Sequence, residues 1–230
     1  MVYENLNIII PCKNEADNLH YIIPKLLTYC NDITVVDGNS EDNTKDICAK
    51  YNVNYIKDNN LGKGAAQRIG ANASKKKYII FFDGDCSHDD KDIPLLYSSI
   101  SEQKLDMVIC SRKTGGSEDL ISTTTYAGFI RATGSDLLAL LLNKLFKTKI
   151  SDVLYSLKAF KTEKFLELNT KENHFGIEID IILKSIRKNF NYIEIPSREK
   201  KRIYGVSKLN TIMGLYFIWQ IIKFKFIKIL

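Results

Sequence analysis

The sequence lacks paired cysteines and long hydrophobic runs. Its five cysteines are an odd number, lie far apart and form no C-x-x-C pair, which argues against a zinc ribbon and a disulfide framework. No apolar run reaches the length of about 18 residues that a membrane-spanning helix needs. The polar segment Met1–Asn7 does not resemble the start of a signal peptide. We therefore expect a reducing, cytoplasmic setting.

The positive charge is concentrated near the C-terminus. The 230 residues carry a net charge of +6, but residues 196–230 hold eight Lys or Arg and one acid, a local charge of +7. The rest of the chain therefore sums to −1. The basic loop 198–208 contains one aromatic residue, Tyr204, which argues against stacking on nucleic-acid bases. The apolar segment 210–230 carries three lysines and fits the surface of an anionic membrane. The alternative is that it packs on the sheet or on another subunit.

Short apolar runs alternate with helical patterns in the first half of the chain. The expected strands are 6–10, 33–36, 53–56, 78–82 and 107–110, and the helices between them are 17–29, 44–51, 63–73 and 93–101. Further on we expect helices at 122–146 and 177–188 and strands at 155–160 and 192–195. This alternation predicts an α/β fold with a mainly parallel central sheet and helices on both faces. We expect one domain over residues 1–209, followed by the tail 210–230.

Asp83-Gly84-Asp85 directly follows the apolar run Tyr78–Phe82. Two carboxylates at the end of a buried strand are costly unless a positive group meets them. The usual partner is a divalent cation that also holds a phosphorylated ligand. His88, three residues further on, is an additional candidate for a metal ligand. A polar strand end without any ligand is the alternative.

Polar residues follow the other expected strands as well, and the carboxyl ends of parallel strands meet at one edge of a sheet. These residues are Pro11, Asn14 and Glu15 after the first strand, Asp37 after the second and Arg112 after the fifth. Gly62-Lys63-Gly64 begins a helix and offers backbone N–H groups and one lysine to phosphate, although neither the Walker nor the Rossmann glycine spacing is present. The basic loop 198–208 is a candidate phosphate clamp.

Taken in order, these segments resemble the family 2 glycosyltransferases of the GT-A fold. The segments are Ile9–Glu15, Val36–Thr44, Gly62–Gly64, Phe82–Asp85, Ser111–Arg112 and Arg202–Lys208. The last of them, which reads R-x-x-G-x-S-K, is similar to the dolichyl-phosphate or polyprenyl-phosphate sugar synthases.

The resemblance implies a role for each matching residue. Pro11, Asn14, Glu15, Asp37, Lys63, Asp83 and Gly84 would bind the donor nucleotide, and Asp83 and Asp85 would hold Mg²⁺ or Mn²⁺. Arg112, Arg131, Ser135, Arg202 and Lys208 would bind the acceptor phosphate, with Asp85, Arg131 and Arg202 as catalytic residues. Ser87 stands where mannose synthases carry a glutamine, so a UDP-sugar is at least as good a donor candidate as GDP-mannose.

The expected reaction is inverting transfer of a hexose or N-acetylhexosamine to dolichyl or polyprenyl phosphate, at the inner face of the membrane, to supply protein glycosylation. A phosphate acceptor is already ionised and needs no general base. A glycan or soluble hydroxyl acceptor is the alternative, and it would need a base such as Glu178 or Asp152. A sugar-1-phosphate nucleotidyltransferase is disfavoured, because Pro11–Glu15 is not a glycine-rich phosphate loop. A non-enzymatic protein that binds nucleotide, nucleic acid or membrane is the alternative of another class.

Overall fold

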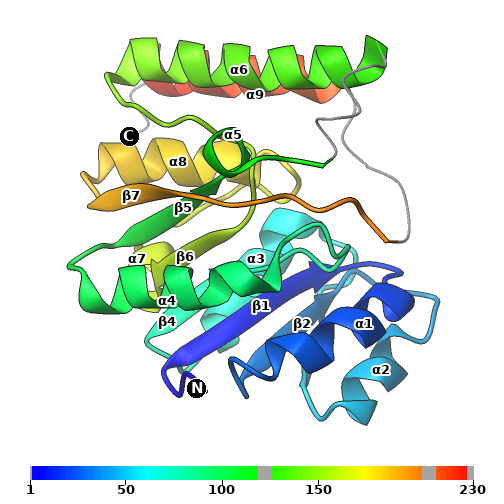
Figure 1. Ribbon diagram of the computed structural model, residues 1–230. Helices are drawn as coiled ribbons and strands as arrows, with labels where there is room; N and C mark the ends of the chain where they lie inside the picture. The colour runs from blue at the N-terminus through cyan, green and yellow to red at the C-terminus, as the bar shows by residue number, and fades with distance from the viewer. Residues whose placement is uncertain (1, 119–125, 204–210, 227–230) are drawn as a thin grey trace.

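A seven-stranded sheet forms the centre of the molecule in the computed structural model, which describes residues 2–118, 126–203 and 211–226 (Figure 1). The strands are β1 (Leu6–Cys12), β2 (Ile33–Asp37), β3 (Asn54–Lys57), β4 (Tyr78–Phe81), β5 (Met107–Ser111), β6 (Lys158–Lys161) and β7 (Tyr192–Pro196). Their order across the sheet is β3-β2-β1-β4-β6-β5-β7. Strand β6 runs antiparallel to β4 and β5, and the other neighbouring pairs are parallel. The expectation of a mainly parallel α/β sheet is confirmed.

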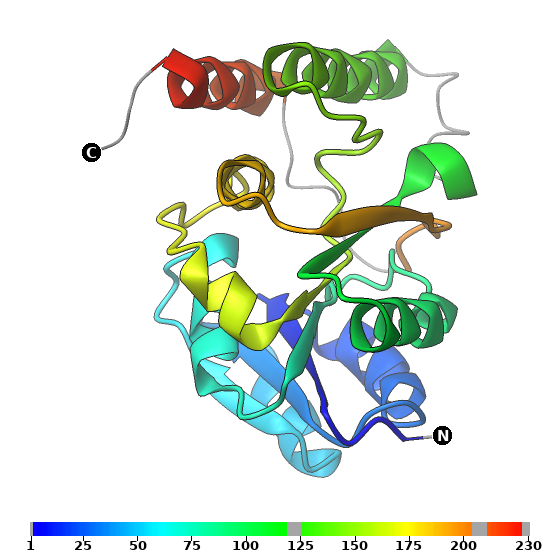
Figure 2. The same cartoon turned by 90° about the vertical axis from the view of Figure 1, so that its left-hand side faces the viewer.

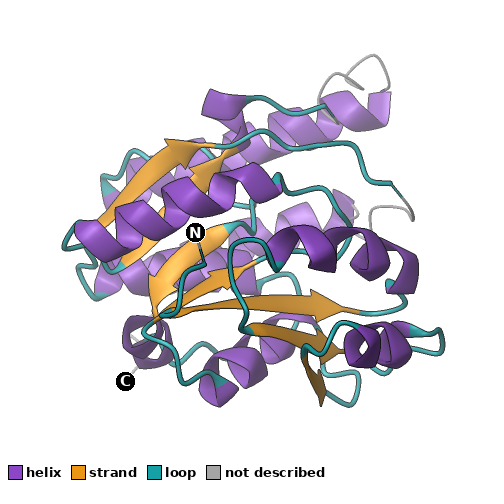
Figure 3. Cartoon of the chain, turned by 60° about the horizontal axis from the view of Figure 1, so that its bottom comes forward, coloured by secondary structure: helices purple, strands orange, loops and turns teal. Residues whose placement is uncertain are grey.

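Helices cover both faces of the sheet, as Figure 3 shows. They are α1 (Ala16–Leu26), α2 (Thr44–Lys50), α3 (Lys63–Ala73), α4 (Ile93–Glu102), α5 (Arg112–Gly115), α6 (Tyr126–Phe146), α7 (Thr162–Glu167), α8 (Ile177–Arg187) and α9 (Thr211–Phe226), with a 3₁₀ turn η1 at Asp90–Asp92. Alternate residues of a strand point to opposite faces. Ile8 and Ile10 of β1 therefore pack with α1 and α4, whereas Ile9 packs in the core that includes α3 and α8. The strands are apolar on both faces because both are covered.

Helices α6 and α9 lie side by side as an outer layer above α8 (Figures 1 and 2). Phe217, Ile221 and Phe224 on the inner face of α9 are buried in the same core as α8. The segment predicted as a separate tail therefore contributes side chains to the domain core. None of the helices in the described ranges is long and apolar enough to cross a bilayer.

The structure differs from the sequence-based prediction mainly around β6. We expected a strand over 155–160, but the strand begins at Lys158, and the preceding residues form a loop that enters the site. The antiparallel direction of β6 was not predicted, because apolar periodicity carries no information on strand direction. The short helices α5 and α7 were missed for a related reason, since four to six residues are too few to show a helical period.

Candidate active site

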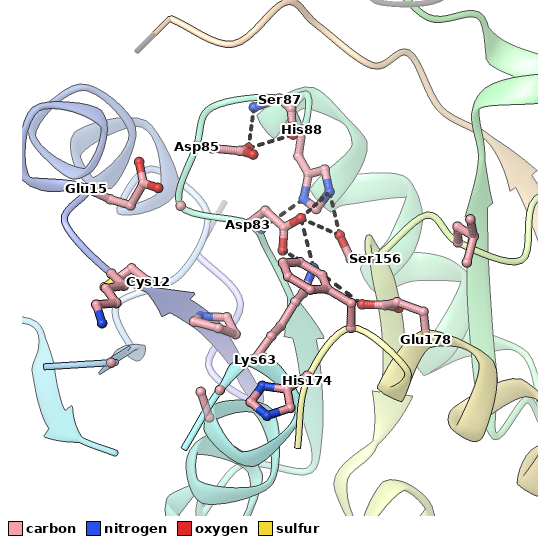
Figure 4. Close-up of a pocket in the computed structure, with 18 of the residues that line it drawn as sticks. Cys12, Glu15, Lys63, Asp83, Asp85, Ser87, His88, Ser156, His174 and Glu178 are labelled. Carbon is pink, nitrogen blue, oxygen red and sulfur yellow. Dashed lines mark hydrogen bonds and ion pairs between the residues drawn. The ribbon is translucent and has the colours of Figure 1, made fainter. Parts of the chain in front are cut away.

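A pocket of about 280 Å³ opens at the carboxyl ends of β1, β2 and β4 (Figure 4). The predicted site residues that line it are Pro11, Glu15, Lys63, Asp83, Gly84, Asp85, Arg112 and Arg202. The strand order explains the convergence, because β1 lies between β2 and β4 in the sheet. The pocket therefore stands at the position where open α/β sheets usually bind ligands.

Asp83 projects into this pocket from the end of β4 (Figure 4). The Lys63 ammonium lies 2.8 Å from its Oδ1 atom, and the Ser156 hydroxyl donates a hydrogen bond of 2.6 Å to its Oδ2 atom. Burial alone would raise the pKa of Asp83, but the charge of Lys63 together with the hydrogen bonds from Lys63 and Ser156 lowers that pKa below its usual value. Asp83 is therefore ionised at neutral pH.

His88 holds Asp83 in place through a closed set of hydrogen bonds. The Asp83 backbone N–H donates to Nδ1 of His88 over 3.0 Å, which puts the imidazole proton on Nε2. That Nε2 atom lies 3.1 Å from the Ser156 hydroxyl, which itself donates to Asp83. Burial lowers the pKa of His88, so the ring is neutral. Both ring nitrogens are engaged, so the expectation that His88 is a candidate metal ligand is corrected to a positioning role.

A buried chain of alternating charges continues from Lys63. Its ammonium lies 3.3 Å from Oε1 of Glu178, and the Lys158 ammonium donates to Oε2 of Glu178 over 2.6 Å and to the Tyr155 carbonyl. Lys158 is fully buried. Burial would raise the pKa of Glu178, but Lys158 and Lys63 lower it. A carboxylate held in this way is a poor proton acceptor, which argues against Glu178 as the general base.

Asp85 is held by a different set of groups. Its Oδ1 atom accepts hydrogen bonds from the Ser87 N–H (3.0 Å) and the Ser87 hydroxyl (2.6 Å). Its Oδ2 atom lies 3.0 Å from Nε of Arg202. The Lys200 N–H donates to the Ser87 carbonyl over 2.8 Å, which ties the segment carrying Arg202 to the Asp85 loop. Ser87 thus orients Asp85, in place of the glutamine that the resemblance led us to look for.

Arg112 is shared between two carboxylates. Its Nε and Nη2 atoms donate to Asp152 over 2.7 and 3.0 Å, and Nη1 donates to Glu199 over 3.0 Å. Burial would raise the pKa of Asp152, but Arg112 lowers it. Asp152 is therefore no better a general base than Glu178. Arg112 lines the pocket, and these three hydrogen bonds leave two of its five N–H donors for an acceptor phosphate, its predicted ligand.

The end of the pocket near β2 and β3 differs from the prediction. Asp37 is buried, accepts hydrogen bonds from the Ser40 N–H (3.1 Å) and the Tyr55 hydroxyl (2.7 Å), and is not among the lining residues. Asn14 likewise bonds within the loops, since its Oδ1 atom accepts from the Glu41 N–H over 2.9 Å. Both residues organise the loops around the pocket in this structure.

Asp58 is a pocket carboxylate that the sequence analysis missed, as it did Glu199. It follows β3, is 2% exposed and lines the pocket. Its Oδ1 atom accepts from the Asn60 N–H over 2.7 Å, and the Asn60 side-chain carbonyl accepts from the Lys13 ammonium over 2.8 Å. The available signal resembled the one used for Asp37, because Asp58 comes two residues after the expected strand 53–56. Lys158 had a signal too, a lone charge inside an apolar run.

The remaining predicted residues belong to α6 and to the segment after β7. Ser135 of α6 is buried and does not line the pocket. The side chain of Arg131 and the whole of Lys208 lie outside the part of the chain that the structure describes. Their roles in acceptor binding and catalysis stay predictions.

The donor atoms present fit a hard divalent cation. Asp83 and Asp85 each offer carboxylate oxygens at the pocket, and cations already balance both groups. No third His, Cys, Asp or Glu completes a metal cluster within the described ranges. Mg²⁺ and Mn²⁺ take oxygen ligands, and Mg²⁺ sites typically use one or two carboxylates together with phosphate and water oxygens. The two aspartates therefore suit a metal that is bound together with a diphosphate.

Comparisons with known proteins found matches in sequence and in structure. The sequence model described as Glycosyl transferase family 2 matches residues 7–168. An uncharacterized protein of Methanocaldococcus jannaschii is 29% identical over 96% of this chain and 99% of its own length. An uncharacterized glycosyltransferase of Mycobacterium tuberculosis is 19% identical over 96% of this chain and 100% of its own length.

The solved structures that resemble the chain include glucosyl-3-phosphoglycerate synthase from Mycobacterium tuberculosis. Its complex with phosphoglyceric acid has a TM-score of 0.75 at 14% identity, covering 96% of this chain and 80% of the other. Its complex with Mn²⁺, UDP and glucosyl-3-phosphoglycerate has a TM-score of 0.70 at 15% identity, covering 96% and 78%. At these identities the likeness concerns the fold. The acceptor in these names is soluble, unlike the lipid phosphate that the sequence led us to expect.

Proposed function

The chain belongs to glycosyl transferase family 2, and we propose that it transfers a hexosyl group from a UDP-sugar to a small, soluble, phosphorylated acceptor. The observation that carries the proposal is the pair Asp83 and Asp85, both lining one pocket at the end of β4 with compensating cations beside them. The neighbouring structures support UDP, a divalent metal and a soluble acceptor. The soluble acceptor, our alternative from the sequence, therefore comes before the lipid phosphate.

The two ends of the pocket suit the two ends of a nucleotide sugar. Asp58 follows β3, and Asp83 follows β4, three strands away in the sheet. At about 4.8 Å per strand, the strands carrying them are ~14 Å apart, which suits a base at one end and a diphosphate at the other. The Asp58 carboxylate can accept a hydrogen bond from N3–H of uracil. In this arrangement Asp58 contacts the nucleotide at the end of the pocket where the resemblance placed Asp37 as a nucleotide-binding residue.

The diphosphate would lie at Asp83 and Asp85. A bound Mg²⁺ or Mn²⁺ would neutralise the charge that develops on the leaving diphosphate. Lys63 and Arg202 line the same region and add fixed positive charge. Burial alone would lower the pKa of Lys63, but Asp83 and Glu178 raise it, so the ammonium stays charged. Inversion at the anomeric carbon stays a prediction.

A hydroxyl acceptor needs a proton acceptor, and Glu178 and Asp152 are both ion-paired. His174 also lines the pocket, and histidine is the residue most often used as a general base. His174 is therefore a candidate for this role.

One observation keeps polyprenyl phosphate as a second candidate acceptor. Phe217 of α9 lines the pocket together with Leu154 and Phe175, so one wall is apolar. A lipid phosphate would also attack without a base, which fits a site whose Glu178 and Asp152 are paired. Transfer to a short polyprenyl phosphate and none to phosphoglyceric acid would establish this candidate.

The test is calorimetric titration of UDP, with and without Mn²⁺, on the wild type and on Asp85→Asn. Asp85 is chosen because Asp83 supports the buried Lys63, so a change there endangers folding. We expect Mn²⁺-dependent binding in the wild type and a loss of at least tenfold in Asp85→Asn. Asp46→Asn on the outer helix α2 is the matched control. Metal-independent binding, or equal affinity in Asp85→Asn, would refute the proposal. Turnover assays with UDP-glucose, UDP-N-acetylglucosamine and GDP-mannose then identify the donor.

A further inference from the structure

Helix α9 is apolar on two opposite faces, and one of them is exposed. Phe217, Ile221 and Phe224 form the buried face. The exposed face carries four residues at helical spacings of four, three and four: Leu215 (71% exposed), Trp219 (50%), Ile222 (43%) and Phe226 (73%). A surface helix of a globular protein normally presents polar residues on this side. The outer face of α9 therefore suits contact with an apolar partner.

Helix α6 extends the same surface. It lies beside α9 in the outer layer (Figures 1 and 2), and its Leu137 and Leu140 are 52% and 66% exposed. We call these two leucines, with Leu215, Trp219, Ile222 and Phe226, the α6–α9 surface. Six large apolar side chains exposed together on two adjacent helices mark an interaction surface rather than scattered exposure.

Lysines gather at one end of this surface. The C-terminal ends of the two helices meet, since the rings of Phe146 and Phe224 lie 6.1 Å apart and the Lys225 ammonium lies 5.3 Å from the centre of the Phe146 ring. The exposed lysines at this end are Lys144, Lys147, Lys149, Lys223 and Lys225. Helix α9 contains no acid, and the one acid of α6, Asp136, forms an ion pair of 2.6 Å with Lys113. The partner must therefore supply the negative charge.

We propose that the α6–α9 surface binds an anionic lipid bilayer, with the two helices lying in the interface. Apolar side chains next to lysines are the composition of interfacial helices, and each lysine near an anionic surface contributes about fivefold in affinity. Trp219 stacks on Tyr216 at 5.7 Å, and the Lys223 ammonium lies 4.4 Å from the Trp219 ring, so amphipathic aromatics stand where the headgroups would be. A second copy of this chain fits less well, because its α6–α9 surface would bring lysines and no unpaired acid.

Bilayer binding would act directly on the pocket. Phe217 lines the pocket from the inner face of α9, while Trp219 stands on the outer face of the same helix. The bilayer and the substrate would therefore contact the two sides of one helix. This inference does not depend on the identity of the acceptor.

The test is sedimentation of the whole protein with vesicles of phosphatidylcholine, with and without 30 mol% phosphatidylglycerol, at about 0.1 M salt. We expect binding to the anionic vesicles, at least about tenfold weaker after Lys223→Glu with Lys225→Glu, and a similar loss after Trp219→Ser with Phe226→Ser. The matched controls are Lys104→Glu and Leu95→Ser, both exposed and outside the α6–α9 surface, and they should bind as the wild type does.

Three outcomes would overturn the inference. The first is no sedimentation with anionic vesicles, and the second is equal losses in the control variants. The third is a dimer in light scattering that Trp219→Ser with Phe226→Ser converts to a monomer, because the surface would then join two copies. Measuring Mn²⁺-dependent UDP binding on the same variants separates this inference from the proposed function, since that binding should stay unchanged.

Discussion

Removing the charge of Glu178 tests whether the buried charges are a structural support or catalytic groups. In Glu178→Gln, the fully buried Lys158 would keep only a neutral amide and the Tyr155 carbonyl as partners. Removing one member of a buried ion pair costs about 3–5 kcal/mol, because the other charge stays in a medium of low polarity. Lys63 is affected less, since Asp83 remains 2.8 Å away. We expect urea denaturation to show a loss of about 3–5 kcal/mol in the free energy of unfolding.

The double variant Lys158→Met with Glu178→Leu sharpens this prediction. It replaces both charges by apolar groups of similar volume, so the loss should fall to about 1 kcal/mol or less. Glu163→Gln on the surface helix α7 is the control, expected to stay within about 0.5 kcal/mol of the wild type. Turnover gives the second readout, because loss of a general base lowers kcat by about 10²–10⁴. The reasoning fails if Glu178→Gln costs less than about 1 kcal/mol, or if it leaves stability intact and abolishes turnover.

Three further predictions follow from individual contacts in the site. Arg202→Ala should bind Mn²⁺ more tightly than the wild type in the absence of nucleotide, because Arg202 competes with the metal for Asp85. Equal Mn²⁺ affinities in calorimetry would contradict this. Arg198→Ala, which removes an ion pair with Glu118, is the control. Asp58→Asn should weaken UDP binding by about 10–100-fold and strengthen CDP binding, because N3–H of uracil donates a hydrogen bond whereas N3 of cytosine accepts one. An unchanged ratio of the two affinities would show that Asp58 does not recognise the base. Arg112 lowers the pKa of Asp152 in the folded protein, so the stabilisation that the ion pair gives is complete above the pKa of about 3.9 in the unfolded chain and disappears as the pH falls through the pKa in the folded protein. Acid unfolding followed by circular dichroism should therefore be steeper for the wild type than for Asp152→Asn. Identical unfolding curves at low pH would refute the ion pair.

The parallel half of the fold was predictable because its signals are local. Helix α3 has the predicted bounds, since Gly62 precedes it with a positive φ of 103° and Ser74 ends it in an extended conformation. Strands β1 and β4 are largely apolar on both faces and polar residues follow them, which is the pattern of a covered parallel strand. Glu15, Asp83 and Asp85 were predicted from strand ends and Lys63 from a glycine-rich helix start, and all four line the pocket.

The partners of these residues were not predictable, because they depend on contacts distant in sequence. Asp83 is held by Ser156, which is 73 residues away and enters the site only because β6 is inserted antiparallel beside β4. Asp37 and Asp58 look alike in sequence, because each is an acid at or just after the end of a strand. The Tyr55 hydroxyl, on the neighbouring strand β3, donates a hydrogen bond to Asp37, whereas Asp58 lines the pocket. No pattern within one strand contains that information.

The charges around the pocket explain why Arg202 is the group most free to change partner. At and behind the Asp83 end of the pocket, four cations are ion-paired with five carboxylates: Lys63, Lys158, Arg112 and Arg202 with Asp83, Asp85, Asp152, Glu178 and Glu199. Lys158 is fully buried, Lys63 is shared by two acids and Arg112 is held by three hydrogen bonds. Arg202 has the most exposed side chain of the four, at 26%, and pairs with one carboxylate oxygen. If Asp85 binds a metal as proposed, Arg202 is therefore the cation that would be able to move to a diphosphate without leaving a buried charge unpaired.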